Sequence, residues 1–244
     1  MIQLLRYCRC VTVALLLATT GVSHALVMSD STSFNTGTIY TSTANSTTPT
    51  SASNYGYAYT SLNGFDSSLG TLTGVSISYD TSAYIRSSIA VRDPSDCWAF
   101  CEDNVSGGGY VRGDFYLDLY DPNLGYNPST SRSSSVNCSD NDGYCSRTTS
   151  TYANYLDGIL FSTTDASLLE QFLDETLNFR ASARTTATTS YCYDTEDTCR
   201  TYGETRFWGN LVVNYTYDEV SVPEPATIGL FVLGLLGFGL RRKG

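Results

Sequence analysis

The chain has 244 residues, and its 24 acidic residues outnumber its 14 basic ones, which gives a formal net charge of −10. A protein this acidic does not bind nucleic acid or an anionic membrane surface by electrostatic attraction. Its single histidine is His24, so the rest of the chain contains no imidazole. This excludes Ser-His-Asp and Cys-His nucleophilic catalysis, histidine general-base chemistry and nearly all catalytic zinc sites.

The first residues have the layout of a secretory signal peptide. Arg6 and Arg9 give a positive start, residues 11–18 (VTVALLLA) are apolar, and Ser23 and Ala25 are small residues at the positions before a cleavage point. We therefore expect a signal peptide over residues 1–25 that is cleaved after Ala25. The apolar run is too short to span a bilayer comfortably, so export is favoured over a membrane anchor at this end.

Residues 26–54 are dominated by Ser, Thr and Asn, with TSTANSTTPTSAS in the middle. This composition predicts a polar linker or a poorly ordered edge ahead of the folded domain, which we expect over residues 55–220.

Alternating segments follow, rich in β-branched and aromatic residues and separated by Gly, Asn and Asp. This pattern predicts strands in residues 55–62, 71–80, 85–91, 115–120, 155–161 and 211–217. Residues 165–177 (DASLLEQFLDETL) differ, because their apolar residues have helical spacing, with Thr164 or Asp165 as the cap. The sequence therefore predicts an all-β fold, an antiparallel β-sandwich with one short helix crossing an end.

Six cysteines lie beyond the signal peptide, in three local pairs within loop-like sequence. The pairs are Cys97 with Cys101, Cys138 with Cys145, and Cys192 with Cys199. In an oxidising compartment disulfides are the default, and short loops close at the lowest entropic cost, so these neighbours are expected to bond. Six cysteines allow fifteen connectivities, and a redox or metal role is the alternative. The spacing of Cys97 and Cys101 is not that of a thioredoxin-type motif, and a tetrathiolate zinc site would need distant partners.

Residues 62–75 (LNGFDSSLGTLTGV) and residues 209–217 (GNLVVNYTY) carry a resemblance of their own. They resemble the opening and the terminal stretch of the choice-of-anchor E domain. The resemblance implies a β-sandwich surface module with an interchangeable C-terminal anchor. It implies no enzymatic activity.

The C-terminus has three parts: Pro223, Glu224 and Pro225, then an apolar, Gly-rich run over residues 226–240, then Arg241, Arg242 and Lys243. Fifteen helical residues cover about 23 Å, against a hydrocarbon core of about 30 Å, and the basic side chains can snorkel to close the gap. Their charge keeps the tail on the cytoplasmic side. We therefore expect a single C-terminal transmembrane helix, with the bulk of the protein outside the cytoplasm.

These three parts, in this order, resemble the PEP-CTERM sorting signal of exported bacterial proteins, here over residues 222–244. The resemblance implies that an exosortase in the inner membrane recognises Pro223, Glu224 and Pro225 and cuts near them. It also implies a final location at the cell surface or in an extracellular matrix of exopolysaccharide. Two prolines around one glutamate keep the backbone extended, as a cleavage site requires.

Several acidic clusters offer oxygen ligands for calcium. They are Asp93 with Asp96, Asp140 with Asp142, and Asp194 with Glu196 and Asp197. Calcium takes six to eight oxygens, and Cys138 occupies the first ligand position that an EF-hand would need. A solvated acidic loop is the simpler interpretation, so no metal or other cofactor is predicted, with Asp140 and Asp142 as the calcium candidates.

Exposed tyrosines, Trp98 and Trp208 could stack on sugar rings, although tyrosine is also a favoured strand residue. A catalytic role would need a pair of carboxylates acting on glycosidic bonds, for which Asp114, Asp118 and Asp121 are candidates without a supporting motif. The predicted function is therefore a non-catalytic structural or adhesive β-sandwich associated with exopolysaccharide and biofilm. A carbohydrate- or calcium-binding module and a carboxylate-dependent glycosidase are the alternatives.

Overall fold

The computed structural model describes residues 25–93, 104–119, 129–141, 144–193 and 197–220. It contains eight strands and one short helical segment. In chain order they are β1 (Ala25–Ser42), β2 (Thr50–Asn63), β3 (Gly70–Arg92), β4 (Val105–Leu119), β5 (Ser129–Asp140), β6 (Tyr144–Thr163), α2 (Ala166–Leu169), the 3-10 turn η1 (Glu170–Phe172), β7 (Thr176–Cys192) and β8 (Thr198–Glu219).

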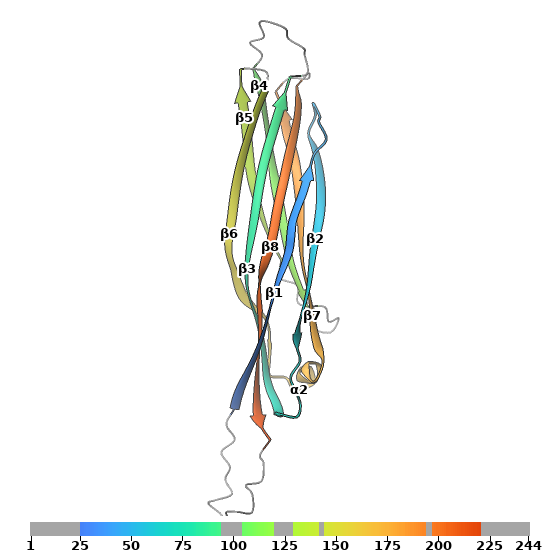
Figure 1. Ribbon diagram of the computed structural model, residues 1–244, viewed down its shortest axis with the longest axis vertical. Coiled ribbons are helices and arrows are strands. Elements are labelled where there is room, and N and C mark those ends of the chain that lie inside the picture. The colour runs from blue at the N-terminus through green and yellow to red at the C-terminus, as the bar shows by residue number, and fades with distance from the viewer. Residues whose placement is uncertain (1–24, 94–103, 120–128, 142–143, 194–196, 221–244) are drawn as a thin grey trace, which may run out of the picture.

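The strands form two four-stranded antiparallel sheets packed face to face, which confirms the predicted β-sandwich (Figure 1). The first sheet has the order β1-β8-β3-β6 and the second the order β2-β7-β4-β5. All strand pairs within the sheets are antiparallel. The strands run along the length of the molecule and make it markedly elongated.

The predicted alternation fixes which side chains lie between the sheets. In β3, Ile77, Ile85 and Ile89 are fully buried, while the alternate positions, such as Arg86, face outward. The two strands expected at 71–80 and 85–91 are in fact one strand, β3, because the alternation continues through residues 81–84. The other expected strands lie within β2, β4, β6 and β8, and residue 120 lies outside the described residues.

Residues 26–54 are not the predicted linker. They form β1 and the start of β2, the edge strands of the first and second sheets, and the domain boundary expected at residue 55 falls inside β2. An edge strand needs one buried face only, and β1 supplies it with Phe34 and Ile39 among polar residues. Sparse apolar residues were therefore enough for strand formation.

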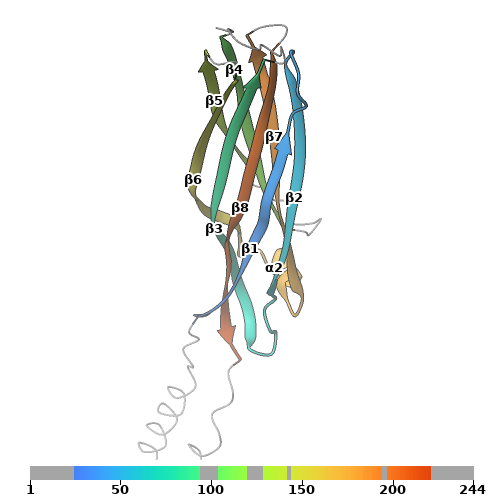
Figure 2. The same ribbon diagram turned by 45° about the horizontal axis from the view of Figure 1, so that its top comes forward.

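The predicted helix over residues 165–177 is shorter than expected. Asp165 is its N-cap, as predicted, with its side chain accepting a hydrogen bond from the backbone N–H of Ser167. Helical structure ends after Phe172, and Asp174 adopts a positive φ of 53° before β7 begins at Thr176. After this turn, Leu177 is the first of the alternate residues of β7 that face the interior. Figure 2 shows α2 beside the end of the sandwich at which the described chain begins and ends.

The two ends of the sandwich differ in what they carry. β1 begins and β8 ends at one end, called here the terminal end (Figure 1). At the other, distal end, four connections each lead from a strand of one sheet to a strand of the other. They are the β1–β2, β3–β4, β5–β6 and β7–β8 connections. Two disulfides lie there: Cys138 bonds to Cys145, and Cys192 to Cys199, with Cα separations of 6.0 and 5.9 Å. Each joins a strand of the second sheet to one of the first. The expected Cys97–Cys101 bond lies outside the described residues.

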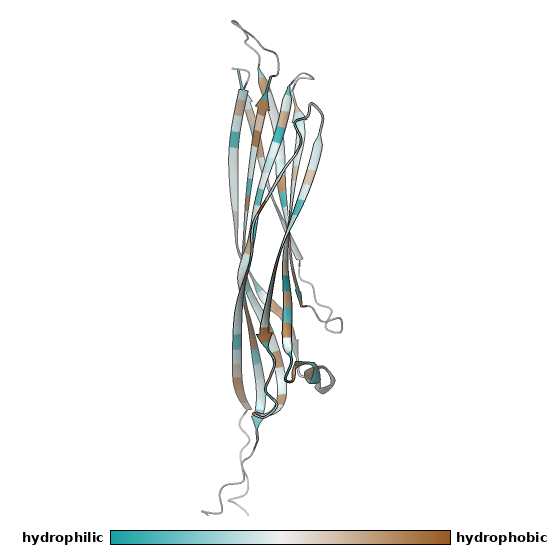
Figure 3. Ribbon diagram, turned by 45° about the vertical axis from the view of Figure 1, so that its right-hand side comes forward, coloured by the Kyte–Doolittle hydropathy of each residue, from teal (hydrophilic) through white to brown (hydrophobic). Residues whose placement is uncertain are grey.

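The interior has three zones along its length. A large apolar cluster that includes Phe65, Phe115 and Phe172 fills most of it, and a small one around the disulfides closes the distal end. The third zone consists of buried hydroxyl groups of both sheets, which form hydrogen bonds with each other. The pairs are Thr43–Thr189 (2.9 Å), Thr189–Thr201 (3.0 Å) and Ser87–Ser134 (3.0 Å). The many Ser and Thr residues give most of the strand length an intermediate hydropathy (Figure 3).

The sheets approach closely near these hydroxyls because β4 contains a run of glycines. A Cβ at Gly109 would collide with the side chain of Thr201 and would lie 2.8 Å from the carbonyl oxygen of Thr188. β4 also changes register with β7 between Gly108 and Gly109. Larger residues at Gly109 would force the strands apart.

Candidate functional site

The outer face of the second sheet gathers tyrosines and charged residues. On β2, alternation places Tyr55, Tyr57 and Tyr59 outward, and they are 52, 52 and 73% exposed. On β4 the same alternation exposes Tyr110 and Tyr116. Tyrosine has a broad apolar ring and a polar hydroxyl, so an exposed row of these side chains is suited to a ligand with both characters.

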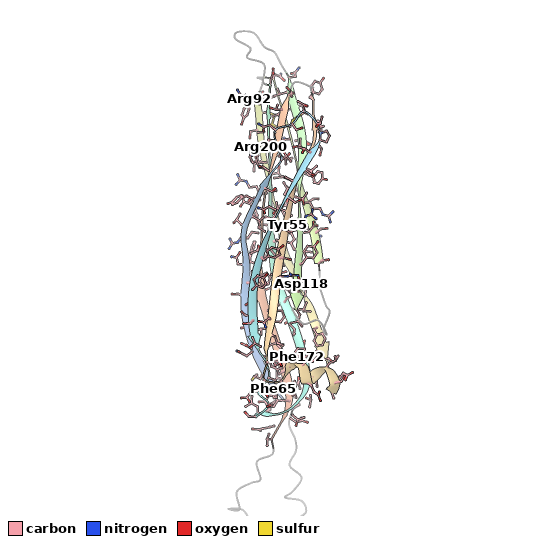
Figure 4. All side chains as sticks on the ribbon, turned by 90° about the vertical axis from the view of Figure 1, so that its right-hand side faces the viewer. Tyr55, Phe65, Arg92, Asp118, Phe172 and Arg200 are labelled. Atoms are coloured by element: carbon pink, nitrogen blue, oxygen red, sulfur yellow. A yellow bond between two sulfur atoms is a disulfide. The ribbon has the colours of Figure 1, made fainter. Side chains whose placement is uncertain are left out.

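The register of the strands places these residues in rows across the sheet. Tyr57 lies opposite Ser182 of β7, which lies opposite Tyr116 of β4. In the neighbouring rows, Tyr55 lies opposite Arg184, which faces Asp114, and Tyr59 lies opposite Arg180, which faces Asp118. Each row therefore contains an outward tyrosine of β2, and the rows on either side of Tyr57 also contain an arginine and an aspartate. Figure 4 shows Tyr55 and Asp118 near the middle of the sandwich.

These rows enclose a shallow groove of about 430 Å³, called here the tyrosine groove. Its lining comes from all four strands of the second sheet. The lining residues are Tyr55, Tyr57, Tyr116, Asp118, Arg180 and Arg184, with Ser129, Ser182 and Ala183. The strands that supply them are hydrogen-bonded along their whole length, so the groove is positioned by sheet backbone and not by loops.

Ion pairs hold the charged side chains of this face in place. Arg180 binds Asp118 through two nitrogens, Nη2 at 2.6 Å and Nε at 3.0 Å, both to Oδ2. Arg112 Nε donates to Asp114 Oδ1 at 2.7 Å, and this hydrogen bond, with the charge of Asp114, raises the pKa of Arg112. Arg184 lies over the ring of Tyr55 at 5.5 Å and donates to Ser53 Oγ at 3.3 Å. The guanidinium and carboxylate groups are therefore oriented before any ligand arrives.

The side chains of this groove have the chemical character of groups that contact sugars. Aromatic rings stack on the apolar face of a pyranose, and paired Arg and Asp side chains retain donors and acceptors for hydroxyl groups. The small side chain of Ser182, between Tyr57 and Tyr116, leaves room for the ring. A groove that is open at the surface accepts a section of a long chain.

Two of the three carboxylates named as glycosidase candidates lie on one strand. Asp114 and Asp118 are on the outer face of β4, four residues apart, so their Cα atoms are separated by about 13 Å. Glycosidase carboxylates are separated by roughly 5 to 9.5 Å. Both are ion-paired with arginine, and Asp121 lies outside the described residues.

The other predicted side chains are dispersed. Trp208 lies on the first sheet with Arg206 above its ring at 5.1 Å, and Trp98 is outside the described residues. Among the calcium candidates, Asp140 ends β5 and accepts a hydrogen bond from the backbone N–H of Asn141, whereas Asp142 is not described. Of the remaining acidic candidates, only Asp93 and Asp197 are described. Within the described part of the chain, no three His, Cys, Asp or Glu residues are grouped as a metal site.

Sequence reasoning missed Arg180 and Arg184. The signal that could have found them is their spacing of four residues in RASAR, which places both on one face of a strand. The alternation of tyrosines in residues 55–59 was visible, but its partners on β7 lie more than 120 positions away. Only the register of the sheet brings the two sets together.

Residues 221–243 match the PEP-CTERM protein-sorting motif. The motif implies a secreted protein that crosses a membrane, is processed by an exosortase and is sorted to the cell surface. The predicted sorting residues Pro223, Glu224 and Pro225, and the basic residues 241–243, fall inside this match but outside the described residues, as does the expected transmembrane helix. None of the described helical segments has the length and apolarity to cross a membrane. Ala25, the expected signal cleavage position, is the first residue of β1.

No curated protein matches the chain. Among solved structures, a structure of the Gt strain of infectious bursal disease virus is 9% identical to this chain, with a TM-score of 0.17. The match covers 84% of this chain and 47% of the viral chain, so this chain spans about half the length of the viral one. TmCBM61 in complex with β-1,4-galactotriose is also 9% identical, with a TM-score of 0.15, over 83% of this chain and 94% of that one.

A metal-free lectin I-B4 from Griffonia simplicifolia is 12% identical, with a TM-score of 0.15, over 73% of this chain and 99% of that one. Similarities at these TM-scores carry no weight for fold or ligand.

The resemblance to the choice-of-anchor E domain stays a prediction. Its two segments do lie side by side in the first sheet, where Leu72 pairs with Tyr217 and Val75 with Tyr215.

Proposed function

We propose that this protein is a non-catalytic adhesive module of the extracellular matrix, sorted by an exosortase, which holds exopolysaccharide in its tyrosine groove. Before processing, the C-terminal segment anchors it in the inner membrane. Afterwards the sandwich acts at the cell surface or in the matrix. The observation that carries the proposal is the set of ordered tyrosine and Arg–Asp rows on a rigid sheet face.

The charge balance of the groove favours a neutral sugar as ligand. Arg112 and Arg180 are compensated by Asp114 and Asp118, so little net charge is left apart from Arg184. Neutral pyranoses bind through stacking and hydrogen bonds to paired polar groups, which is the combination present here. A purely structural sandwich would not need three exposed tyrosines aligned on one strand.

The test is binding of the full-length, disulfide-bonded protein to neutral polysaccharides, with β-1,4-galactan, β-1,4-glucan and α-1,4-glucan as probes. Retardation in gels that contain each polymer measures the affinity. We expect at least one polymer to bind, and Tyr57→Ala to weaken that binding about tenfold, because a central aromatic anchor contributes most to such contacts.

Tyr193→Ala is the matched control, because Tyr193 is 72% exposed and is not part of the groove. It should leave retardation unchanged. Equal losses in both variants, or no retardation by any polymer, would overturn the binding role. Shortened polymer chains after incubation would instead support a glycosidase.

A further inference from the structure

A second groove lies on the opposite side of the molecule, on the outer face of the first sheet. It has a volume of about 550 Å³ and is lined by residues of β1, β3 and β8. The register aligns Tyr40 with Glu204 and Arg86 in one row, and Ser42 with Tyr202 and Ser88 in the next. Tyr40 is 65% and Tyr202 41% exposed, so aromatic rings flank this groove as well.

This face differs from the tyrosine groove in its charge. Arg86 and Glu204 line the groove, and Arg200 and Arg206 lie beside it at neighbouring outward positions of β8. We call this set the arginine face. Positive charge is concentrated here although residues 26–222 contain only nine arginines against 23 acidic residues. A local excess of positive charge on an otherwise acidic protein favours the binding of a negatively charged ligand at that surface.

Two of the three arginines, Arg200 and Arg206, are held by neutral groups, which leaves their charge uncompensated. Arg200 lies 4.8 Å over the ring of Tyr202 and donates from Nη2 to Ser42 Oγ at 2.9 Å. Arg206 lies over Trp208 and donates from Nε to Asn35 Oδ1 at 3.1 Å. Arg86 forms an ion pair with Glu204 at 3.6 Å, so the excess positive charge of this face comes from Arg200 and Arg206. Figure 4 shows Arg200 in the distal half of the sandwich.

We infer that the arginine face is a second binding site, specific for an acidic polysaccharide whose sugars carry carboxylates. Guanidinium groups bind carboxylates through paired hydrogen bonds, and Tyr40 and Tyr202 offer rings for stacking on the sugars. The inference shares with the proposed function only the premise that the protein binds polysaccharide, since the site is separate.

The charge of the whole protein favours a polyuronate over a nucleic acid. Duplex DNA carries one negative charge per about 1.7 Å, so its repulsion by the acidic remainder of the chain is strong. A polyuronate carries one charge per sugar and presents ring faces to the tyrosines. Because this repulsion is weaker, the two uncompensated charges of Arg200 and Arg206 are sufficient to hold such a polymer.

The experiment measures binding of the full-length, disulfide-bonded protein to polygalacturonate, alginate and hyaluronate, with methyl-esterified polygalacturonate and duplex DNA for comparison. We expect binding to at least one uronate polymer at about 50 mM salt and clear weakening at about 500 mM, because salt screens the charges. Esterification, which removes the carboxylate charge, should abolish it. The double variant Arg86→Gln/Arg206→Gln should bind at least tenfold more weakly.

Arg132→Gln/Arg147→Gln is the matched control, because both residues are exposed arginines outside the two grooves. Equal losses in the two double variants, DNA binding as tight as uronate binding, or no binding to any uronate would each overturn the inference. Tyr57→Ala separates the two proposals. Uronate binding that survives Tyr57→Ala and fails in Arg86→Gln/Arg206→Gln supports this site even if no neutral polymer binds the tyrosine groove.

Discussion

At the scale of single residues, tyrosine serves two different purposes in this protein. Tyr57 keeps its ring in solvent on a sheet face, whereas Tyr215 is fully buried and donates its hydroxyl to the carbonyl oxygen of Asn63 at 2.7 Å. Burial, and to a smaller extent the charge of Asp30, raises the pKa of Tyr215 well above its ordinary value. The buried phenol therefore stays neutral in the folded state at pH values where an exposed one ionises.

This shift makes the stability of the protein sensitive to alkaline pH. The folded pKa lies above the unfolded one of about 10, so the stabilisation by Tyr215 is complete below pH 10 and declines as the pH rises further. Tyr215→Phe should cost about 1 kcal/mol at pH 7, because the carbonyl of Asn63 loses its donor. The stability difference between the wild type and Tyr215→Phe should then shrink between about pH 9.5 and 11.5.

Urea denaturation at several pH values measures that difference. Tyr59→Phe is the control, because Tyr59 is exposed and its hydroxyl is in solvent in both states. A difference that stays constant across this range would contradict the assignment of the shift to burial.

At the scale of elements, the two disulfides join the sheets where apolar contacts are few. Cys138 and Cys145 connect β5 to β6, and Cys192 and Cys199 connect β7 to β8, within a small cluster around Ile89 and Val91. That cluster is much smaller than the main core. The distal end therefore depends on covalent bonds more than the rest of the sandwich does.

The double substitution Cys138→Ser/Cys145→Ser should lower the free energy of unfolding by about 2–3 kcal/mol, as expected for a short closed loop. Amide exchange should accelerate at the distal ends of β5 and β6 and stay slow beside Phe65 and Phe172, where the large cluster remains intact. Ser135→Ala, an exposed change on β5, is the control. Faster exchange along the whole sandwich would show that the bond stabilises the fold globally and not locally.

The strands that could be predicted were those with apolar alternation. Parts of β3 and β8, such as residues 75–79 and 211–217, carry Ile, Val, Leu and aromatic residues at alternate positions, and these parts were visible in the sequence. β7 was not predicted, because its inward residues include Ala181, Ala183 and Ala187 beside buried threonines. Small residues give little contrast in hydropathy between the two faces, so the usual signal of a strand is weak.

The sequence indicated the residue type of the candidate site but not its position. The number of tyrosines suggested that some could stack on sugars, and the alternation in residues 55–59 suggested one exposed face. The pairing of Tyr55 with Arg184 and of Tyr59 with Arg180 depends on the register between β2 and β7. That register is set by burial across a sandwich and by a turn at Asp174, neither of which local sequence determines.

At the scale of the whole molecule, the sorting motif and the two proposed binding grooves lie in different parts of the sandwich. The sorting motif follows β8 at the terminal end, and the two grooves lie on opposite faces. β3 alone, with 23 residues, extends over about 75 Å. The distal connections are therefore held far from any membrane that the C-terminal segment enters.

Sorting can be tested by mass spectrometry of the protein from its native host, with cell-envelope and matrix fractions compared. We expect a product that starts at Leu26 and ends near Pro223 to Pro225, without the Gly-rich tail, because the match to the sorting motif covers this stretch. Glu224→Ala should leave the tail attached, and Glu219→Ala, a nearby acidic residue at the end of β8, should not. An intact C-terminus through Gly244 in every fraction would contradict processing.

The position of β8 also determines how the molecule bears mechanical load. β8 lies between β1 and β3 and is hydrogen-bonded to both over almost its entire length, from Thr198 to Glu219. Interstrand hydrogen bonds run perpendicular to antiparallel strands, so a pull along β8 from its C-terminal end loads both ladders in shear. Many bonds must then yield together, whereas a peeling force breaks them one after another. A cell held by this strand to a polymer on the faces of the sandwich would be tethered along the direction in which the fold resists tension best.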